Sequence, residues 1–431
     1  MAAEPQTAPA AIGRFGRGPR AWLRELGPGL ITGAADDDPS GIVTYSQAGA
    51  AFGYALGWSV VLTLPFMVAV QEISARLGRV TGAGLAAALR RHAPMPVLAT
   101  LVGLLVVANV INLGADIGAM AAVTKLMIGG PEQLYALAIA VVCASGEIWL
   151  AYKRYVKLLK WLTVSLLAYV ALLFVVEVPW REALIGAFVP RFTFDAATLT
   201  TVLAVLGTTI SPYLFFWQAA EEAEDELNEP DSRPLREHPR DAAGEMRRID
   251  LDTWVGMTFS NLVALSIVIG TAATLHAKGI TDIGSAADAA AALRPIAGPF
   301  AQVIFSLGIF GTGLLAVPTL AGSAAYAVGE SFNWTVGLSR RAIEARAFYG
   351  TIAGATLVGT AIAFSPLDPI KALFWSAVIN GVVAGPLIVA MVILGSLQSV
   401  MGSLTLPLWL RVLGWLSALL MVAGTVGMLV V

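Results

Sequence analysis

The chain has 431 residues, of which 57% are hydrophobic and only 13% are charged. Soluble domains carry about 25% charged residues, so roughly half of the usual polar surface is missing. This composition excludes a soluble globular protein. The net charge of −2, without a basic region, excludes a nucleic-acid-binding domain, and the single cysteine, Cys143, excludes an internal disulfide. We therefore expect a polytopic membrane protein.

The N-terminal region is rich in Ala, Pro and Arg, and it lacks the short apolar core and cleavage site of a signal peptide. We interpret residues 1–27 as a disordered cytoplasmic tail. Residues 28–430 are then a single transmembrane domain.

Eleven stretches in this domain are apolar and long enough to cross a membrane as a helix, which needs about 20 such residues. Because each run is continuous rather than alternating, the pattern predicts helices and not the strands of a barrel. The fold class is therefore all-α. The stretches are 29–50, 56–76, 97–128, 132–150, 157–178, 198–218, 253–275, 298–329, 347–365, 370–395 and 406–430.

Most of the 27 lysines and arginines lie in the N-terminal tail and in every second connection after it. Basic connections stay on the cytoplasmic side of a membrane, so we expect a cytoplasmic N-terminus and an extracytoplasmic C-terminus. The longest connection, 219–252, then lies inside the cell, between the sixth and seventh helices. Its prolines and mixed charges predict a solvated loop.

Two of the predicted spans contain a proline among polar residues near their middle. They are "GAADDDPSGIVTYSQ" (33–47) in the first span and "LGTTISPYLFFWQ" (206–218) in the sixth. Proline removes a helix hydrogen bond, and non-helical backbone at this depth is tolerated only where it is buried in protein or lines a cavity. The two spans are five apart, so a five-span repeat must be inverted. Paired interruptions of this kind indicate the central site of a transporter.

Asp38 stands directly before Pro39, where the first helix is expected to unwind. A carboxylate inside a membrane is costly and by default marks a functional site. Together with the hydroxyls of Ser40, Thr208 and Ser211, it offers hard oxygen donors that suit Mg²⁺, Ca²⁺ or Mn²⁺. The neighbouring acids, Asp36 and Asp37, point in other directions along a helix, and we interpret them as a polar lining of the access path.

The interrupted segments resemble the NRAMP family of divalent metal transporters. "GPGLITGAADDDPSG" resembles the first helix of that family, whose motif there is Asp-Pro-Gly-Asn, and "TTISPYLFF" sits where the family has Met-Pro-His. The resemblance extends over essentially all eleven spans. It implies a LeuT-type fold with two inverted five-helix repeats, helices 1 and 6 broken, and transport by alternating access.

The departures from the family motif are informative. Asp38 keeps the aspartate, whereas Gly41 replaces the asparagine ligand, Ser211 the methionine ligand and Tyr213 the histidine. Thr208 aligns with the position that contributes a backbone carbonyl. Loss of the thioether and of the asparagine predicts a wider, oxygen-only site, which suits a partly hydrated Mg²⁺. These substitutions resemble the branch called NRAMP-related magnesium transporters.

A second departure concerns protons. The stretch "NLGADIGA" (112–119) resembles the segment that carries acids for proton movement, but Asn112 and Ala115 occupy the acidic positions. We therefore expect transport that is not proton-coupled. Asp116 is retained as an intramembrane acid, which either faces the site or makes a structural hydrogen bond. In the tenth span, Asn380 could supply the ligand that a glutamine gives the family, or could bond a neighbouring helix.

The sequence thus predicts transport of divalent metal cations, foremost Mg²⁺ and also Mn²⁺, by a protein that is not an enzyme and needs no cofactor. Its partners are the metal ion and the lipid bilayer, not nucleic acid. The predicted metal-site residues are Asp38, Gly41, Thr208, Ser211, Asp116 and Asn380.

Two alternatives stay open. The nearer is a proton-coupled Mn²⁺/Fe²⁺ NRAMP transporter. The more distant is a LeuT-type carrier of an organic solute, although three acids in the first break would oppose the carboxylate of such a substrate. An intramembrane aspartyl hydrolase is disfavoured, because no further catalytic constellation accompanies Asp38 and Asp116.

Overall fold

The computed structural model describes residues 32–33, 35–149, 167–191, 193–228, 233–239, 242–284, 286–291, 298 and 301–430. The tail expected over 1–27 lies outside the described residues, as does most of the fifth predicted span.

The described part of the chain is helical throughout and contains no strand. The helices are α3 (Pro39–Phe52), α4 (Gly57–Thr81), α5 (Leu85–His92), α6 (Met95–Ile128), α7 (Glu132–Trp149), α9 (Leu167–Leu172), α10 (Trp180–Phe188), α11 (Ala196–Thr209), α12 (Pro212–Asn228), α13 (Ala242–Thr274), η3 (His276–Lys278), α14 (Ala286–Ala291), α16 (Ala301–Ser331), α17 (Arg346–Ala363), α18 (Pro369–Ser396), α19 (Gln398–Met401) and α20 (Leu408–Val430).

Seven helical segments of the described chain are long and apolar enough to cross a membrane. These are α4, α6, the interrupted pair α11–α12, α13, α16, α18 and α20. They correspond to predicted spans, as do the helices α3, α7 and α17. The fifth predicted span is described only from Leu167 onward. The all-α, multi-span architecture expected from the sequence is confirmed.

The first span is broken where the sequence places its three acids. Residues 35–36 are helical, whereas Asp37 and Asp38 are not, and α3 begins at Pro39. Asp38 has an extended backbone, with φ −68° and ψ 173°. Proline disfavours the helical conformation in the residue before it, which explains why the helix restarts at this point.

The sixth span is broken in the same way. α11 ends at Thr209, Ile210 leaves the helical region with φ −120° and ψ 61°, and α12 begins at Pro212. Both predicted interruptions are therefore confirmed, and each immediately precedes a proline.

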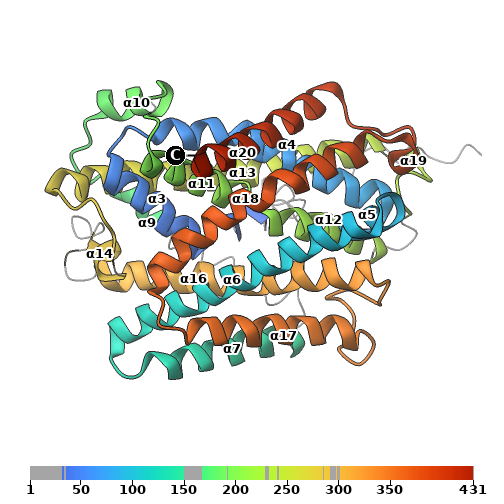
Figure 1. Ribbon diagram of the computed structural model, residues 1–431, viewed down its shortest axis with the longest axis horizontal. Helices are drawn as coiled ribbons and strands as arrows, with labels where there is room; N and C mark the ends of the chain where they lie inside the picture. The colour runs from blue at the N-terminus through green and yellow to red at the C-terminus, as the bar shows by residue number, and fades with distance from the viewer. Residues whose placement is uncertain are drawn as a thin grey trace, which may run out of the picture.

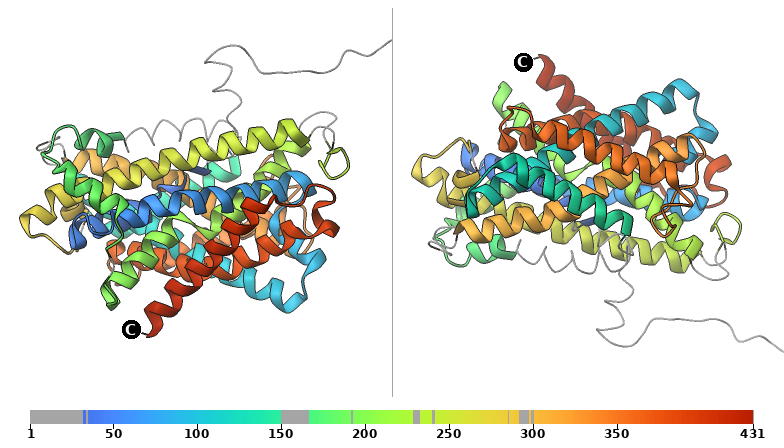
Figure 2. Two further views of the ribbon diagram at one scale, coloured as in Figure 1. Left: turned by 90° about the horizontal axis from the view of Figure 1, so that it is seen from above. Right: turned by 90° about the horizontal axis from the view of Figure 1, so that it is seen from below.

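The two broken helices lie in the middle of the bundle. α3 packs against α11, α13 and α18, and α12 packs against α4 and α16. α7 and α17 lie side by side at one edge of the bundle (Figure 1). α20 crosses the opposite side obliquely and its end projects from the bundle (Figure 2). Many of its large apolar side chains are exposed.

Glycine allows two of these helices to cross at very short range. A Cβ atom added to Gly207 of α11 would lie 2.1 Å from the carbonyl oxygen of Ala377 in α18. No real side chain tolerates this distance. The contact between α11 and α18 therefore requires glycine at this position.

The loop expected over 219–252 is shorter than predicted. α12 continues to Asn228, and α13 already begins at Ala242. The side chain of Glu222 is fully buried and forms an ion pair with Arg248. These charged residues were predicted to be solvated, and that prediction is wrong for Glu222, because its charge is paired inside the protein.

Candidate metal site

The side chain of Asp38 caps the N-terminus of α3. Its Oδ1 accepts hydrogen bonds from the amide of Gly41 at 2.8 Å and from the hydroxyl of Ser40 at 2.6 Å. Its Oδ2 accepts from the carboxamide Nδ2 of Asn112 in α6, at 3.0 Å. Asp38 is 1% exposed. A carboxylate in this position satisfies free N–H groups of the helix, so its orientation is fixed by α3 and α6 together.

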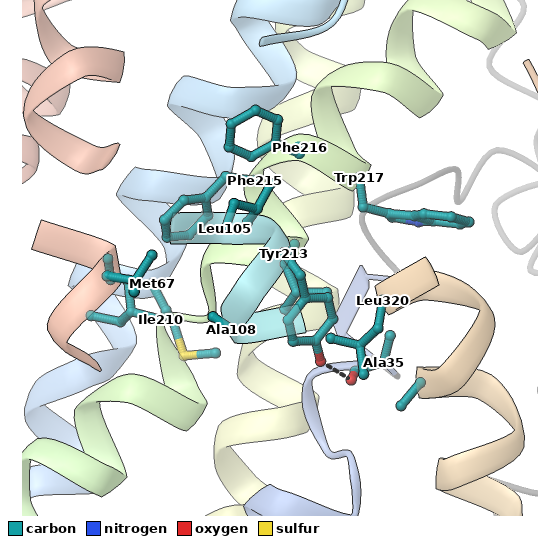
Figure 3. Close-up of a cluster of buried hydrophobic side chains, with 14 of the residues drawn as sticks. Ala35, Met67, Leu105, Ala108, Ile210, Tyr213, Phe215, Phe216, Trp217 and Leu320 are labelled. Atoms are coloured by element: carbon teal, nitrogen blue, oxygen red, sulfur yellow. Dashed lines mark hydrogen bonds between the residues drawn. The ribbon is translucent and has the colours of Figure 1, made fainter. Parts of the chain in front are cut away.

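Tyr213 of α12 joins the two breaks from the other side. Its hydroxyl donates to the carbonyl oxygen of Ala35 at 2.8 Å (Figure 3) and lies 3.5 Å from Oδ2 of Asp38. Tyr213 is completely buried. It therefore holds the segment just before the first break against the start of α12.

The second break presents the C-terminal carbonyls of α11 to the same region. The hydroxyl of Ser211 lies 2.7 Å from the carbonyl oxygen of Thr208 and 3.2 Å from that of Gly207. The hydroxyl of Thr208 lies 3.5 Å from that of Ser40. Thr208 and Ser40 thus bring the two breaks into contact.

The start of α12 is held rigidly on both sides. Ser323 of α16 donates to the carbonyl of Tyr213 at 2.8 Å, and Ser74 of α4 donates to that of Phe215. Phe215, Phe216 and Trp217 follow as buried aromatic side chains among the apolar residues shown in Figure 3. The second break is therefore built on a well-packed support.

The electrostatics of this region favour a cation. The C-terminal end of a helix carries a partial negative charge, and α11 directs this end towards Asp38. Four carboxylates here are fully or almost fully buried. In the described part of the chain, the ion pairs lie elsewhere. The buried acids are Asp36, Asp37, Asp38 and Asp116.

Asp36 and Asp37 do not share the hydrogen-bond partners of Asp38. Both accept from the hydroxyl of Ser260 in α13, at 2.7 Å and 3.2 Å respectively. One carboxylate oxygen of each is buried without a hydrogen-bond partner. The prediction that these acids point away from Asp38 agrees with this arrangement.

Gly41 does not leave an open space. A Cβ atom added to it would lie 3.2 Å from the hydroxyl oxygen of Thr208 and 3.3 Å from the ring of Tyr45. The widening that the sequence predicts at this position is therefore wrong for this conformation. The observed contribution of Gly41 is its amide, which orients Asp38.

Asp116 and Asn380 are buried, but neither is hydrogen-bonded to the other predicted ligands. Both carboxylate oxygens of Asp116 and both polar atoms of Asn380 are without hydrogen-bond partners. Asp116 lies one turn after Asn112 on α6, and Asn112 donates to Asp38. The structure thus brings together Asp38, Gly41, Thr208 and Ser211. Asp116 and Asn380 make no hydrogen bond to these four residues.

Sequence reasoning missed Asn112 as a direct partner of Asp38, and it missed Ser376 of α18. The hydroxyl of Ser376 lies 2.8 Å from Oδ1 of Asn112. The sequence indicates Asn112 only as the replacement for an acid. Among the described residues, no group of three or more His, Cys, Asp or Glu is placed to hold a metal. A cation here would rely on one carboxylate and neutral oxygen donors.

Two cavities lie towards opposite ends of the bundle. One, of about 450 Å³, is lined by Val43 and Gln47 of α3 and by Phe374 of α18. The other, of about 470 Å³, is lined by residues of α5, α12 and α16, among them Ala220 and Glu224. Since α3 and α12 run from the breaks towards opposite ends (Figure 1), each cavity follows one of the broken helices.

Comparison with known structures defines the fold. A crystal structure of the Eremococcus coleocola manganese transporter superposes with a TM-score of 0.73, covering 96% of this chain and 88% of that chain, at 18% sequence identity. The fold is the LeuT type, with two inverted five-helix repeats and an additional helix.

Comparison of sequences then gives the family. The family model described as natural resistance-associated macrophage protein-like matches residues 29–431. This chain belongs to the Nramp family. A divalent metal cation transporter, MntH, of Klebsiella pneumoniae is 27% identical over 412 residues, which cover 93% of this chain and 92% of the relative. MntH of Aeromonas hydrophila is 30% identical over 338 residues, covering 76% and 78%.

Proposed function

We propose that this protein transports divalent metal cations across a membrane, Mg²⁺ foremost and Mn²⁺ as well, by alternating access and without proton coupling. The family and its relatives named as divalent metal cation transporters support the general activity. The choice of ion and the driving force come from this chain's own residues.

The observation that carries the proposal is the meeting of the two breaks at Asp38 and Thr208. Helix ends and a carboxylate converge there, and a broken helix with free carbonyls is how such transporters coordinate cations. Every side chain that is hydrogen-bonded to Asp38 offers a hydroxyl or an amide: Ser40, Asn112 and Tyr213. As metal ligands, the oxygen atoms of these side chains and of Asp38 are hard, and hard oxygen ligands suit Mg²⁺ and Mn²⁺.

The absence of a thioether at Ser211 favours Mg²⁺. A soft sulfur ligand selects transition metals, whereas a hydroxyl or carbonyl does not. Mg²⁺ also dehydrates reluctantly and is bound through few protein ligands with several waters retained. One carboxylate at the breaks, with neutral oxygens around it, fits that mode of binding. Asp116 and Asn380 would take part through a conformational change or through such waters.

The replacement of titratable groups supports transport without protons. Tyr213 occupies the place of the family's histidine, and its hydroxyl donates a hydrogen bond to the carbonyl of Ala35. Asn112 occupies an acidic position and donates to Asp38 instead of carrying a proton. The metal ion would then move down its own gradient and the membrane potential. Asp116 is the one remaining acid of this stretch.

Alternating access would use the two cavities in turn. One cavity lies along α3 and the other along α12, on opposite sides of the breaks. The distribution of basic residues supports a cytoplasmic position for the end of α12. We therefore assign the cavity beside α12 to the cytoplasmic side, with the N-terminus cytoplasmic and the C-terminus outside.

The experiment is Mg²⁺ uptake into proteoliposomes by the native protein and by Asp38→Asn. We expect uptake by Asp38→Asn to fall to the level of empty liposomes, because the substitution removes the carboxylate that caps α3 where the two breaks meet. Asp195→Asn is the matched control, since Asp195 caps the far end of α11 and asparagine caps a helix equally well; its uptake should equal that of the native protein.

Uptake by Asp38→Asn at the level of the native protein would contradict the proposal.

A thermal-shift screen separates the organic-solute carrier from the metal transporter. Mg²⁺ and Mn²⁺ should raise the melting temperature of the native protein, because a ligand stabilises the state it binds. Stabilisation by amino acids and not by either metal would favour the organic-solute carrier.

A further inference from the structure

The carboxamide of Asn112 lies between Asp38 and Ser376. Its Nδ2 donates to Oδ2 of Asp38 at 3.0 Å, and its Oδ1 lies 2.8 Å from the hydroxyl oxygen of Ser376. None of the three side chains is more than 1% exposed. The three residues come from three elements: the first break, α6 and α18. Asn112 is therefore held at both ends in the interior of the bundle.

The hydroxyl of Ser376 has two acceptors within reach but only one proton. One acceptor is Oδ1 of Asn112, and the other is the carbonyl oxygen of Leu373, at 2.7 Å. If the proton goes to Leu373, the oxygen of Ser376 becomes an acceptor. The carboxamide of Asn112 can then turn by 180° and donate from Nδ2 to Ser376. Its Oδ1 would replace Nδ2 beside Asp38.

The carboxamide keeps a hydrogen bond to Ser376 in both orientations. One orientation is favoured in the absence of a cation and the other in its presence. Without a cation, the carboxylate of Asp38 requires a donor, and Nδ2 provides one. A divalent cation beside Asp38 repels the positively polarised Nδ2–H groups of Asn112 and attracts its Oδ1. An amide oxygen is a hard ligand of the kind that Mg²⁺ and Ca²⁺ accept.

We infer that Asn112 turns its carboxamide when the cation arrives and binds it through Oδ1. This inference rests on the proposed function, because it names a ligand of the same site. Gly41 lacks a side chain, so the first break offers no amide oxygen of its own. The structure supplies one from α6 instead, and Ser376 is the positioning residue that makes the turned orientation stable.

The test is calorimetric titration of the purified full-length protein with Mg²⁺. Asn112→Leu, which has a similar shape and no oxygen, should raise Kd at least about 10-fold, equivalent to 1.4 kcal/mol. Asn112→Asp is the discriminating variant. If Asn112 binds through oxygen, a carboxylate replaces that ligand and Kd stays close to the native value or falls.

A mere hydrogen-bond role predicts the opposite for Asn112→Asp. If Asn112 serves only to orient Asp38 through Nδ2, the carboxylate of Asn112→Asp supplies no such donor, and Kd would rise as in Asn112→Leu. That result would overturn the inference. Asn109→Leu is the control, because Asn109 lies one turn away on α6 and donates to the carbonyl of Leu320; its Kd for Mg²⁺ should not change.

Ser376→Ala gives a second test that a structural role would not pass. In the native background it should raise Kd several-fold, because the turned carboxamide loses its acceptor. In the Asn112→Asp background it should have no effect, since the two oxygens of a carboxylate are equivalent and need no turn. Equal effects of Ser376→Ala in both backgrounds would contradict the inference.

Infrared difference spectroscopy tests the native side chain directly, which matters because Asn112→Leu removes two buried hydrogen bonds. With ¹³C in the asparagine side-chain carbonyls, Mg²⁺ should shift one carbonyl band to lower frequency. The shift should be absent in Asn112→Asp. No shift, or a shift that persists in that variant, would overturn the inference.

Asp38→Asn separates the two proposals. If Asp38→Asn abolishes Mg²⁺ binding while Asn112→Leu binds like the native protein, the inference on Asn112 fails and the proposed function stands. If the native protein binds neither Mg²⁺ nor Mn²⁺, the proposed function fails first.

Discussion

The side chain at position 211, a hydroxyl in Ser211, determines whether the proposed metal site contains a soft ligand. It bonds the carbonyl oxygens of Thr208 and Gly207, at the end of α11. A thioether in its place would add a soft ligand and release the carbonyl of Thr208. Soft ligands favour transition metals over Mg²⁺, so this residue should control the choice between Mg²⁺ and Mn²⁺.

We predict that Ser211→Met raises the ratio of Mn²⁺ to Mg²⁺ affinity about 10-fold, a difference near 1.4 kcal/mol. Titration of each metal into the purified variant gives this ratio. Ser211→Ala, which removes the hydroxyl without adding sulfur, should keep the native ratio. A Ser211→Met protein with the native ratio would argue that the cation does not contact this position.

At the scale of residues, the sequence predicted the parts of the site that one segment determines. Asp38 was identified because it stands between a proline and an apolar run, and its cap on α3 follows from local backbone geometry. Asn112 and Ser376 were not identified as its partners. Their contact depends on how α6 and α18 pack against the first break, and no spacing within the chain encodes that distance.

At the scale of elements, ion pairs connect α12 to α4 and α13. Arg248 of α13 binds the fully buried Glu222 of α12, and it also contacts Glu245, which pairs with Arg79 of α4. Gln218 donates a hydrogen bond to Glu222 and accepts one from Thr32, which precedes the first break. This network explains why charged residues after the sixth span are helical and not a solvated loop.

We predict that Arg248→Ala destabilises the protein by about 3 kcal/mol, because it leaves the carboxylate of Glu222 buried and unpaired. Lys125→Ala is the control, since Lys125 pairs with Glu132 at the surface, with the two side chains 54% and 28% exposed. Its effect should stay below about 1 kcal/mol. Unfolding followed by tryptophan fluorescence compares them, and equal losses of stability would contradict the network's role.

The crossing of α11 and α18 gives a second prediction at this scale. Gly207→Ala should destabilise the protein by about 1–3 kcal/mol, because the new methyl group would overlap the carbonyl of Ala377. Gly103→Ala in α6 is the control, since a Cβ atom there meets nothing within 4 Å. The measurement is the melting temperature of each variant. A Gly207→Ala protein as stable as Gly103→Ala would show that the helices can separate freely.

The sequence patterns located some helix ends correctly and others not. Proline and the polar residues around it located both breaks, because proline acts on the residue directly before it. Charge, by contrast, does not indicate a solvated loop over all of 219–252, because α12 continues to Asn228 and α13 begins at Ala242. Glu222 and Arg248 are far apart in sequence, and only the packing of α12 against α13 brings them together.

At the scale of the whole molecule, the protein is a bundle in which two interrupted helices meet near four buried carboxylates. The proposed driving force is the membrane potential acting on the cation. A potential of 100 mV is worth about 2.3 kcal/mol per charge, or about 4.6 kcal/mol for a divalent ion. This is sufficient to drive uptake without a second coupled ion.

The most direct measurement records Mg²⁺ and pH together inside proteoliposomes that carry the native protein and a Mg²⁺ gradient. We predict that Mg²⁺ enters, that an inside-negative potential accelerates its entry, and that the internal pH stays constant. Internal acidification in proportion to metal uptake, or no entry of Mg²⁺ where Mn²⁺ enters, would contradict the account.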